Sequence, residues 1–477
     1  MSKTYNSGYV LGITLVATLG GLLFGYDTAV ISGTVASIEH YLIIPNGLGT
    51  FALGATVSSA LFGCIIGGFI SGFCSSKLGR KNSLMVAALL FFVAAFGTAY
   101  PEFLFFKQGE SNMGVLWAFN AYRIIGGIGV GLASAVCPMY IGEIAPAEIR
   151  GRLVSFNQFA IIFGMLVVYF VNWGIANGQT DAWIHETGWR YMFLSLAIPS
   201  ALFGILLFFV PETPRYLSLA NQDNKALNVL EKINGKERAA KIMAEIKASM
   251  TEAMKSKLTS YGITVIVIGI LISVFQQFVG INVVLYYAPE IFKSMGGSTD
   301  TAMLQTVVMG LVNVIFTVVA IVTVDKWGRK PLLITGSIGM AIGMFAISAL
   351  AYKEVLGIST LVFIIIYTAS FMMSWGPICW VLISEIFPNK IRGQAVAIAV
   401  AAQWTANYII SSTFPPMIEF SSAVAYGFYG TMAVISAIFV WKFVPETKGK
   451  TLEEIEKIWK KKCIIDERNR SYNCDLR

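Results

Sequence analysis

The stretch GEIAPAEIRG, from Gly142 to Gly151, recurs later in the chain as SEIFPNKIRG, from Ser384 to Gly393. Two further pairs accompany it in the same order and at nearly constant separation: SSKLGRK (Ser75–Lys81) with TVDKWGRK (Thr323–Lys330), and PETPR (Pro211–Arg215) with PETKG (Pro445–Gly449). One such match would mean little, but three in order indicate an internal duplication. The chain is therefore predicted to consist of two related halves.

The composition places these halves in a membrane. Of the 477 residues, 56% are hydrophobic and 13% are charged, about half the charged share usual for a soluble protein. Continuous apolar runs of about twenty residues, long enough to cross a bilayer as helices, recur along the chain, whereas a membrane β-barrel would show short alternating segments. We predict an all-α membrane protein with twelve transmembrane helices at roughly 9–36, 49–75, 83–105, 113–142, 153–176, 190–210, 261–292, 301–323, 331–352, 359–386, 394–418 and 423–444.

Basic residues are unequally distributed over the short loops. Those after even-numbered spans carry Lys77, Arg80, Lys81, Arg150, Arg152, Lys326, Arg329, Lys330, Lys390 and Arg392, whereas those after odd-numbered spans carry Lys107, Lys293 and Lys353. This asymmetry predicts that both termini are cytoplasmic, and it explains the net charge of +8 without nucleic acid. The first apolar run is too long for a signal peptide and is expected to remain as helix 1.

A single long polar segment, from about Pro214 to Thr259, separates two groups of six spans. Its helix-forming residues and mixed charge predict short amphipathic helices. The predicted organisation is an N-terminal six-helix half (1–212), a cytoplasmic linker (213–259), a C-terminal six-helix half (260–445) and a cytoplasmic tail (446–477). Parallel six-helix repeats of this kind are typical of alternating-access transporters, whose site lies between the repeats near the bilayer midplane.

These motifs resemble those of the major facilitator superfamily, specifically its sugar porter family, over nearly the whole chain. The stretches most similar to members that take up D-xylose with a proton are GGLLFGYDTAVISG, RIIGGIGVGLAS, SFNQFAIIFG, FQQFVGINVVLYYAPE, SWGPICWVLISEIFP and AIAVAAQW. The resemblance implies a secondary active transporter for proton-coupled uptake of an aldose such as D-xylose. One departure is Ser76, which stands where the wider superfamily usually has Asp, whereas the second half keeps Asp325.

The first apolar run carries a carboxylate, Asp27, within LLFGYDTAVISG (Leu22–Gly33). A charge at the centre of a bilayer is costly, so a partner is expected. Arg123 in the fourth run is the candidate, because both residues lie about ten residues from the outer ends of their spans. The pair is either a permanent structural bridge or a proton-coupling pair that helix movement separates. Proton-coupled sugar porters resemble this chain in having Asp at this position, which favours coupling; an uncoupled hexose or pentose uniporter is the alternative.

The other polar residues near the middle of the membrane are uncharged and both donate and accept hydrogen bonds, as a sugar requires. A lone residue of this kind would more often join helices. The resemblance implies that the substrate is bound by Phe24, Gln158, Gln276, Gln277, Asn282, Tyr286, Asn313, Trp380, Gln403 and Trp404. Met165 stands where the pattern of xylose-transporting members has Gln, which leaves open the preference among xylose, glucose and related sugars. SWGPICW (Ser374–Trp380) predicts a break in the tenth span.

Charged residues at the cytoplasmic helix ends form a third predicted set. The resemblance implies that a cytoplasmic gate, which joins the two halves when that side is closed, contains Arg80, Glu143, Arg150, Arg215, Arg329, Glu385 and Arg392. The alternative is that these residues serve to set the topology.

The remaining sequence features argue against other classes of protein. Six cysteines without metal-binding spacing and two histidines predict no metal site, and no cofactor is expected. The glycines of GGIGVG (Gly126–Gly131) lie in a membrane run and predict close helix packing rather than nucleotide binding. An enzyme would need a catalytic cluster and a nutrient sensor would need a long cytoplasmic extension, and neither feature is evident in the sequence. The expected partners are the sugar, the proton and the lipid of a bacterial inner membrane, with no nucleic acid and a monomeric protein.

Overall fold

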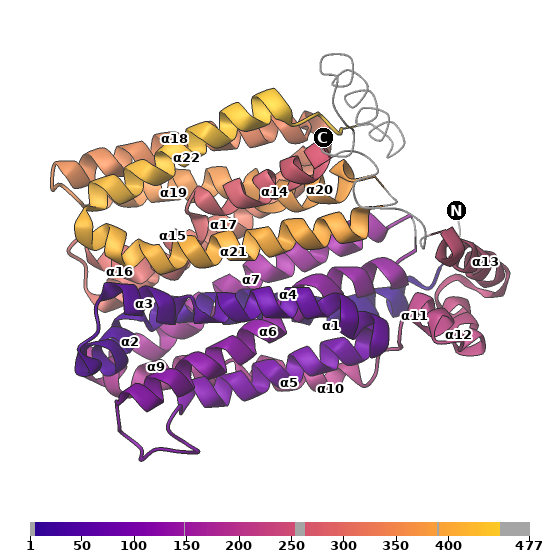
Figure 1. Cartoon of the computed structure of the whole chain (residues 1–477), viewed down its shortest axis with the longest axis horizontal. Coiled ribbons are helices and arrows are strands. Elements are labelled where there is room, and N and C mark those ends of the chain that lie inside the picture. Colours follow the sequence, from indigo (N-terminus) through magenta and orange to yellow (C-terminus); the bar gives the residue numbers. More distant parts are fainter. Residues whose placement is uncertain (1–4, 147, 253–262, 389–390, 449–477) are drawn as a thin grey trace. The chain divides into compact units, whose positions relative to one another are not determined.

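The computed structural model describes residues 5–146, 148–252, 263–388 and 391–448, without the side chains of residues 249–252, 325, 384, 392 and 393. Every regular element in those ranges is helical, as predicted (Figure 1). The chain divides into two compact units: unit 1 comprises residues 1–49 and 56–254, and unit 2 comprises residues 50–55 and 255–477.

Unit 1 is built on long helices joined by short helical turns. The helices that correspond to the predicted spans are α1 (Ser7–Val30), α4 (Ser59–Lys77), α5 (Arg80–Ala99), α6 (Met113–Ile144), α7 (Arg150–Ala176) and α10 (Ala197–Leu207). The other elements are η1 (Ile31–Gly33), α2 (Val35–Ile38), η2 (Glu39–Ile43), η3 (Ile44–Asn46), α8 (Asp181–Trp183), η4 (Ile184–Gly188), α9 (Trp189–Leu194), α11 (Pro214–Leu219), α12 (Asp223–Asn234) and α13 (Lys236–Glu252). Helix α3 (Thr50–Val57) is divided between the units.

Unit 2 repeats this pattern. It contains α14 (Ile263–Phe278), α15 (Ile281–Tyr286), α16 (Ala288–Lys293), α17 (Thr299–Trp327), α18 (Arg329–Tyr352), α19 (Ile358–Met372), α20 (Trp375–Ile386), α21 (Arg392–Phe420) and α22 (Ser422–Phe443). Helix α20 begins after a break at Ser374, where φ is −132° and ψ is −92°. This confirms the break predicted from SWGPICW.

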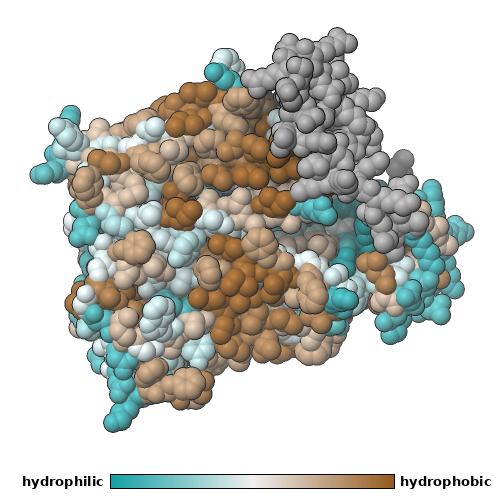
Figure 2. Space-filling view, viewed as in Figure 1, coloured by the Kyte–Doolittle hydropathy of each residue, from teal (hydrophilic) through white to brown (hydrophobic). Residues whose placement is uncertain are grey.

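Eleven helical stretches within the described residues are long and apolar enough to cross a membrane. Ten of them correspond to predicted spans 1 to 10 and the eleventh, Ser422–Phe443, to span 12. The remaining predicted span is α21, whose apolar run is interrupted by amides and hydroxyls such as Gln403, Asn407 and Ser411. Broad hydrophobic surface covers the long helices, whereas the surface of α12 and α13 is largely hydrophilic (Figure 2).

Two predicted spans differ from the observed helices. Span 3, expected to reach residue 105, ends at Ala99, because Pro101 follows and restricts the residue before it to extended backbone. Span 7, expected as one helix to residue 292, is interrupted at Gly280, where φ is +90°. A side chain at Gly280 would lie 2.7 Å from the Tyr429 ring, so both the conformation and the space require glycine.

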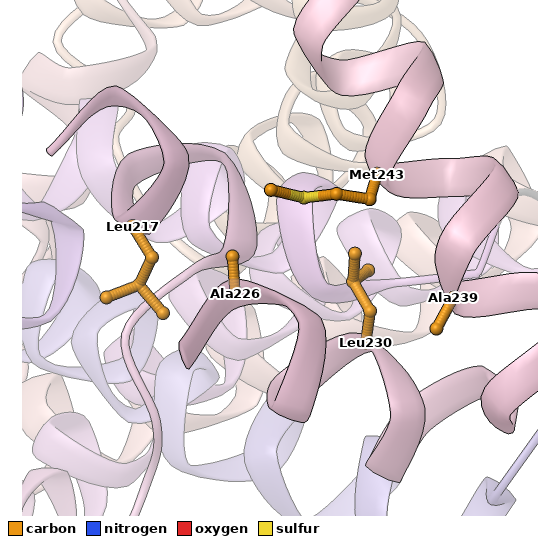
Figure 3. Packing of buried hydrophobic residues seen from close by; sticks show 5 residues of the cluster. All are labelled: Leu217, Ala226, Leu230, Ala239 and Met243. Carbon is orange, nitrogen blue, oxygen red and sulfur yellow. The ribbon is translucent and has the colours of Figure 1, made fainter. Parts of the chain in front are cut away.

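The polar segment after unit 1's last long helix forms the short helices that the sequence predicts. Leu217 of α11, Ala226 and Leu230 of α12, and Ala239 and Met243 of α13 form a small hydrophobic cluster (Figure 3). Two ion pairs, Lys247–Asp223 at 2.6 Å and Arg238–Glu148, lie on its surface. The backbone N–H of Asn6 donates to the Ile233 carbonyl at 2.8 Å, which joins α12 to the beginning of α1.

Glycines bring two helix pairs of unit 1 into backbone contact. A Cβ at Gly25 of α1 would lie 1.9 Å from the Ile161 carbonyl oxygen of α7, and one at Gly164 of α7 would lie 2.2 Å from the Leu22 oxygen. Helices α4 and α6 meet in the same way, since a Cβ at Gly127 would lie 1.8 Å from the Ala60 oxygen. The close packing expected of GGIGVG is therefore confirmed.

The duplicated loops place a carboxylate at the same point of each half. Glu212 accepts from the backbone N–H groups of Arg80 and Lys81 at the start of α5, at 3.1 and 3.0 Å. Glu446 accepts from those of Arg329 and Lys330 at the start of α18, at 3.1 and 2.9 Å. Both sites satisfy N–H groups that lack a partner within the helix, at the end where the helix dipole favours an anion.

The two carboxylates differ in environment. Burial raises the pKa of the Glu212 carboxyl above its ordinary value, although the N–H groups of Thr213, Lys81 and Arg80 oppose this. Burial acts in the same direction on Glu446, but there the N–H groups of Lys448, Arg329, Lys330 and Thr447 outweigh it. The pKa of Glu446 therefore falls below its ordinary value, so its ionised form is the one that stabilises the fold.

We expect Gly25→Val to lower the apparent melting temperature of the detergent-purified protein by about 5 °C or more, because the added atoms meet the α7 backbone. Gly12→Val is the matched control, since the same helix leaves open space beside Gly12. Equal melting temperatures for the two variants would contradict the close contact between α1 and α7.

Glu446→Ala and Glu212→Ala should each lower the free energy of unfolding by about 1–3 kcal/mol, because each leaves backbone N–H groups without an acceptor. Thermal unfolding followed by tryptophan fluorescence measures the change. Glu245→Ala, at an exposed position of α13, serves as control and should have little effect. The capping role fails if all three variants unfold like the unmodified protein.

Candidate functional site

Asp27 of α1 and Arg123 of α6 form a buried ion pair in unit 1. Their side chains are 1% and 2% exposed, and Arg123 Nη1 lies 3.2 Å from Asp27 Oδ1. The same guanidinium also approaches the Asp27 carbonyl oxygen, at 3.4 Å from Nη1 and 3.5 Å from Nη2. The matched depths inferred from the sequence thus correspond to a contact in the structure.

The pair is incomplete. Asp27 Oδ2 and Arg123 Nε have no hydrogen-bond partner among the described residues. A parallel two-bond pairing is the strong arrangement of an arginine and a carboxylate, and here a single N–H joins the two charged groups. Oδ2 therefore remains an acceptor that a proton or a water molecule can occupy.

Gln276 of α14 lies at the centre of a polar network in unit 2. Its Oε1 accepts from Gln403 Nε2 of α21 and, at 3.2 Å, from Gln277 Nε2. Its Nε2 donates at 3.0 Å to the carbonyl of Trp375, the first residue after the break in span 10. Asn282 Nδ2 of α15 donates to Gln277 Oε1 at 2.6 Å. Four of the predicted sugar-binding amides are thus joined, and they connect three helices to the start of α20.

A second polar group lies further along α21. Asn407 Nδ2 donates to the Tyr286 hydroxyl at 3.3 Å, and Ser411 Oγ donates to Asn407 Oδ1 at 3.1 Å. Asn407 is 1% exposed and is absent from the sequence-based set of candidates. Its position four residues after Gln403, on the same helix face, is the signal that identifies it.

The other predicted substrate residues occupy separate positions. In unit 2, Asn313 of α17 is buried, and its Oδ1 has no hydrogen-bond partner among the described residues. Trp404 is buried on α21, and Trp380 is half-buried on α20. In unit 1, Phe24 of α1 is buried and Gln158 of α7 is half-buried, and Met165 lies two helical turns beyond Gln158.

Amides both donate and accept hydrogen bonds. A network of them can therefore exchange its internal bonds for bonds to a ligand that carries several hydroxyl groups. The described part of this network contains no charged side chain, which suits a neutral ligand. Indole rings such as those of Trp380 and Trp404 in unit 2, and the phenyl ring of Phe24 in unit 1, have flat apolar faces.

The predicted gate residues pair within their own halves. Arg80 Nη2 lies 2.8 Å from Glu143 Oε1, and Thr213 Oγ1 donates to Glu143 Oε2 at 2.6 Å. Arg329 contacts Glu385 through two bonds, at 2.9 and 3.2 Å. Thr447 Oγ1 then donates to Glu385 Oε2 at 2.6 Å, as Thr213 does in the first half.

The remaining gate candidates differ. Arg150 is exposed and approaches the Ala145 carbonyl at 3.5 Å, and Arg215 is exposed on α11. The side chain of Arg392 lies outside the described residues. The role of all seven residues in joining the two halves stays a prediction.

A buried ion pair that sequence reasoning missed lies near the end of α5 that is remote from Arg80. Arg190 Nη2 of α9 lies 2.8 Å from Glu102 Oε1, and Nη1 lies 3.1 Å from Glu102 Oε2 and 2.8 Å from the Ala99 carbonyl. Arg190 stood at the edge of a predicted helix and Glu102 inside a predicted span. The signal was a carboxylate in that span, with an arginine as its possible partner at the start of another.

Comparisons with known proteins agree with this architecture. Residues 13–459 match the family described as sugar (and other) transporters. The D-xylose-proton symporter of Escherichia coli (strain K12) is 55% identical to this chain, and the alignment covers 96% of the chain and 97% of that protein. The glucose facilitated diffusion protein of Zymomonas mobilis is 38% identical over 96% of the chain and 99% of that protein.

A solved structure of the inward-open conformation of the xylose transporter from E. coli has a TM-score of 0.86. It is 54% identical, and the match covers 94% of this chain and 100% of that one. The family match and the structural likeness extend over both units. The chain belongs to the sugar (and other) transporter family and has the twelve-helix fold of the major facilitator superfamily.

Proposed function

We propose that this protein is a secondary active transporter, not an enzyme, and that it takes up an aldose together with a proton. The aldose that we favour as substrate is D-xylose. The observation that carries the proposal is the buried, singly bonded pair of Asp27 and Arg123. A permanent structural bridge is most stable with two bonds, whereas a pair that must open repeatedly is easier to separate when it has only one.

The proton step follows from the free oxygen of this pair. A proton from the outer side adds to Asp27 Oδ2, and the neutral carboxyl no longer attracts the Arg123 guanidinium. The loss of this attraction favours the rearrangement that exposes the site to the cytoplasm. When the proton leaves on that side, the carboxylate reforms its bond to Arg123 and the cycle can repeat.

The neutral amide network supports a sugar as the cotransported substrate. Gln276, Gln277, Asn282 and Gln403 are placed to exchange hydrogen bonds with ring hydroxyls. We propose that Gln158, Tyr286 and Asn313 add further bonds, and that Phe24, Trp380 and Trp404 contact the C–H faces of the ring. D-xylose is favoured because the E. coli relative that is 55% identical is a D-xylose-proton symporter.

The proposed setting is the bacterial inner membrane, with both termini in the cytoplasm and the protein acting as a monomer surrounded by lipid. The two six-helix halves, residues 1–212 and 260–445, alternate the exposure of the site. Arg80, Glu143, Arg329 and Glu385, with Arg150, Arg215 and Arg392, are proposed to close the cytoplasmic end. Their charge-assisted bonds are discrete and breakable, as a gate requires.

An uncoupled uniporter is the second candidate, because the Zymomonas mobilis relative is a facilitated diffusion protein. In that case Asp27 and Arg123 would form a permanent bridge. Addition of D-xylose to a weakly buffered suspension of cells that contain the protein separates the two functions. A symporter makes the medium more alkaline, whereas a uniporter leaves its pH unchanged.

Asp27→Asn should abolish the accumulation of labelled D-xylose against its gradient, because the amide cannot take up a proton at this position. Sugar binding and sugar exchange across the membrane of preloaded vesicles should persist, since they need no net proton movement. Uptake into energised membrane vesicles and counterflow measure the two activities. Glu354→Gln, the same type of change at an exposed position, is the control. A mutant at position 27 that still concentrates sugar would exclude Asp27 as the proton carrier.

Gln403→Ala should weaken D-xylose binding about tenfold or more, because it removes an amide and leaves Gln276 Oε1 with one bond fewer. Equilibrium binding of labelled sugar to the purified protein measures this change. Gln394→Ala tests the same substitution at an exposed position of the same helix. Equal D-xylose binding by Gln403→Ala and Gln394→Ala would contradict the assigned network. Competition by unlabelled glucose and arabinose then establishes the sugar preference that Met165 leaves open.

A further inference from the structure

Arg123 has a second neighbour besides Asp27, and it is an aromatic ring. The guanidinium carbon lies 5.4 Å from the ring centroid of Phe193 on α9, within the range of a cation–π interaction. Phe193 is 1% exposed, so water competes little for the cation at this face. The proton-coupling mechanism described above makes no use of this ring.

Phe193 is held in place from two sides. Its ring packs edge-to-face against Phe119 at 5.7 Å and 77°, and against Trp189 at 6.3 Å and 84°. Phe119 lies one helical turn before Arg123 on α6, and Trp189 one turn before Phe193. The ring is therefore fixed by the helix that carries the arginine and by its own helix.

Trp189 is fixed in turn by the second buried ion pair. The Arg190 guanidinium lies 4.6 Å from the Trp189 ring centroid, and Glu102 and the Ala99 carbonyl hold that guanidinium. A continuous series of contacts thus runs from the Glu102–Arg190 pair through Trp189 and Phe193 to Arg123. The position of the Phe193 ring does not depend on Asp27.

We propose that Phe193 is a positioning residue of the proton-coupling pair, which holds the Arg123 guanidinium in both charge states of Asp27. When Asp27 is ionised, the ring face keeps Arg123 in the orientation in which one N–H reaches the carboxylate and Oδ2 stays open. When Asp27 carries the proton, the ring remains as a partner for a buried cation that has lost its counter-ion. The inference rests on the proposed proton role of Asp27.

Among the residues that the structure describes, few groups near this site can change charge. Besides Asp27 and Arg123, these are the buried Cys64 thiol of α4, which interacts electrostatically with both charged groups, and the Tyr26 hydroxyl, which bonds to Ser195 Oγ at 2.7 Å. The Glu102–Arg190 pair lies behind Trp189 and remains closed by two bonds. Buried thiols and phenols stay neutral over the working range of a transporter. Asp27 is therefore the group whose protonation a change at Phe193 affects.

Removal of the aromatic face should disfavour the state with protonated Asp27, because that state leaves Arg123 without a counter-ion. For Phe193→Leu in proteoliposomes, the external pH for half-maximal D-xylose accumulation should move about half a unit to one unit toward acid. Sugar counterflow at constant pH should change less than about twofold, since it requires no net protonation. Phe203→Leu is the matched control, because Phe203 is equally buried in the same unit and should leave the pH profile unchanged.

Two further variants separate the charge effect from a packing defect. Incorporation of 3,4,5-trifluorophenylalanine at position 193 keeps the shape of the ring but weakens its attraction for cations, and should shift the profile in the same direction. Phe193→Tyr keeps the aromatic face and should have the same pH profile as the unmodified protein. If Phe193→Leu does not fold, the fluorinated variant tests the positioning role of Phe193.

The outcomes distinguish this inference from the function on which it rests. If the unmodified protein concentrates D-xylose and the fluorinated variant has the same pH profile, the positioning role of Phe193 is wrong. If the unmodified protein itself concentrates no sugar under a proton gradient, the proposed coupling fails, whatever the variants do.

Discussion

A carboxylate and a guanidinium buried within the membrane-spanning helices, and joined by a single bond between their charged groups, impose the main constraint on unit 1. Either group alone in this environment would carry a penalty of several kcal/mol, so each needs the other. A fully paired bridge would be difficult to open, and an unpaired one would not be stable. The geometry lies between these extremes, with one side-chain bond formed and one acceptor oxygen left over. This arrangement permits a cycle in which protonation of Asp27 releases its bond to Arg123, while the contact of Arg123 with Phe193 remains.

The surroundings of the pair supply what such a balance needs. Gly126 of α6 lies beside Asp27, since a Cβ there would be in van der Waals contact with Oδ1, at 3.4 Å. Phe193 gives the arginine a face that no change in protonation removes. In unit 2 the amides around Gln276 bond to one another, whereas Gln403 Oε1 and Asn313 Oδ1 have no hydrogen-bond partner among the described residues. Both units thus keep their functional groups partly satisfied without closing them permanently.

Much of this organisation could be predicted from the sequence, and the failures have physical reasons. The duplicated motifs predicted two related sets of helices, and counting residues along two helices predicted the contact between Asp27 and Arg123, because helical rise converts sequence distance into depth. Pro377 and Gly376 predicted the break before α20. The interruption at Gly280 was missed because a single glycine in an apolar run does not reveal its backbone conformation, and the Tyr429 ring that leaves no space for a side chain there belongs to a distant helix. The Glu102–Arg190 pair and the ring of Phe193 were missed because hydrophobic periodicity does not reveal which side chains meet across helices.

The glycine contacts of unit 1 have a mechanical consequence. Backbone touches backbone between α1 and α7 and again between α4 and α6, so each couple behaves as one stiff body. Asp27 belongs to the first body and Arg123 to the second, and the boundary between the bodies passes between their side chains. Packed helices commonly shear past each other by about 1–2 Å, and a slide of about 2 Å would lengthen the 3.2 Å bond to about 3.8 Å, beyond hydrogen-bond reach. The charge pair can therefore be uncoupled by sliding along this seam, with every helix left intact.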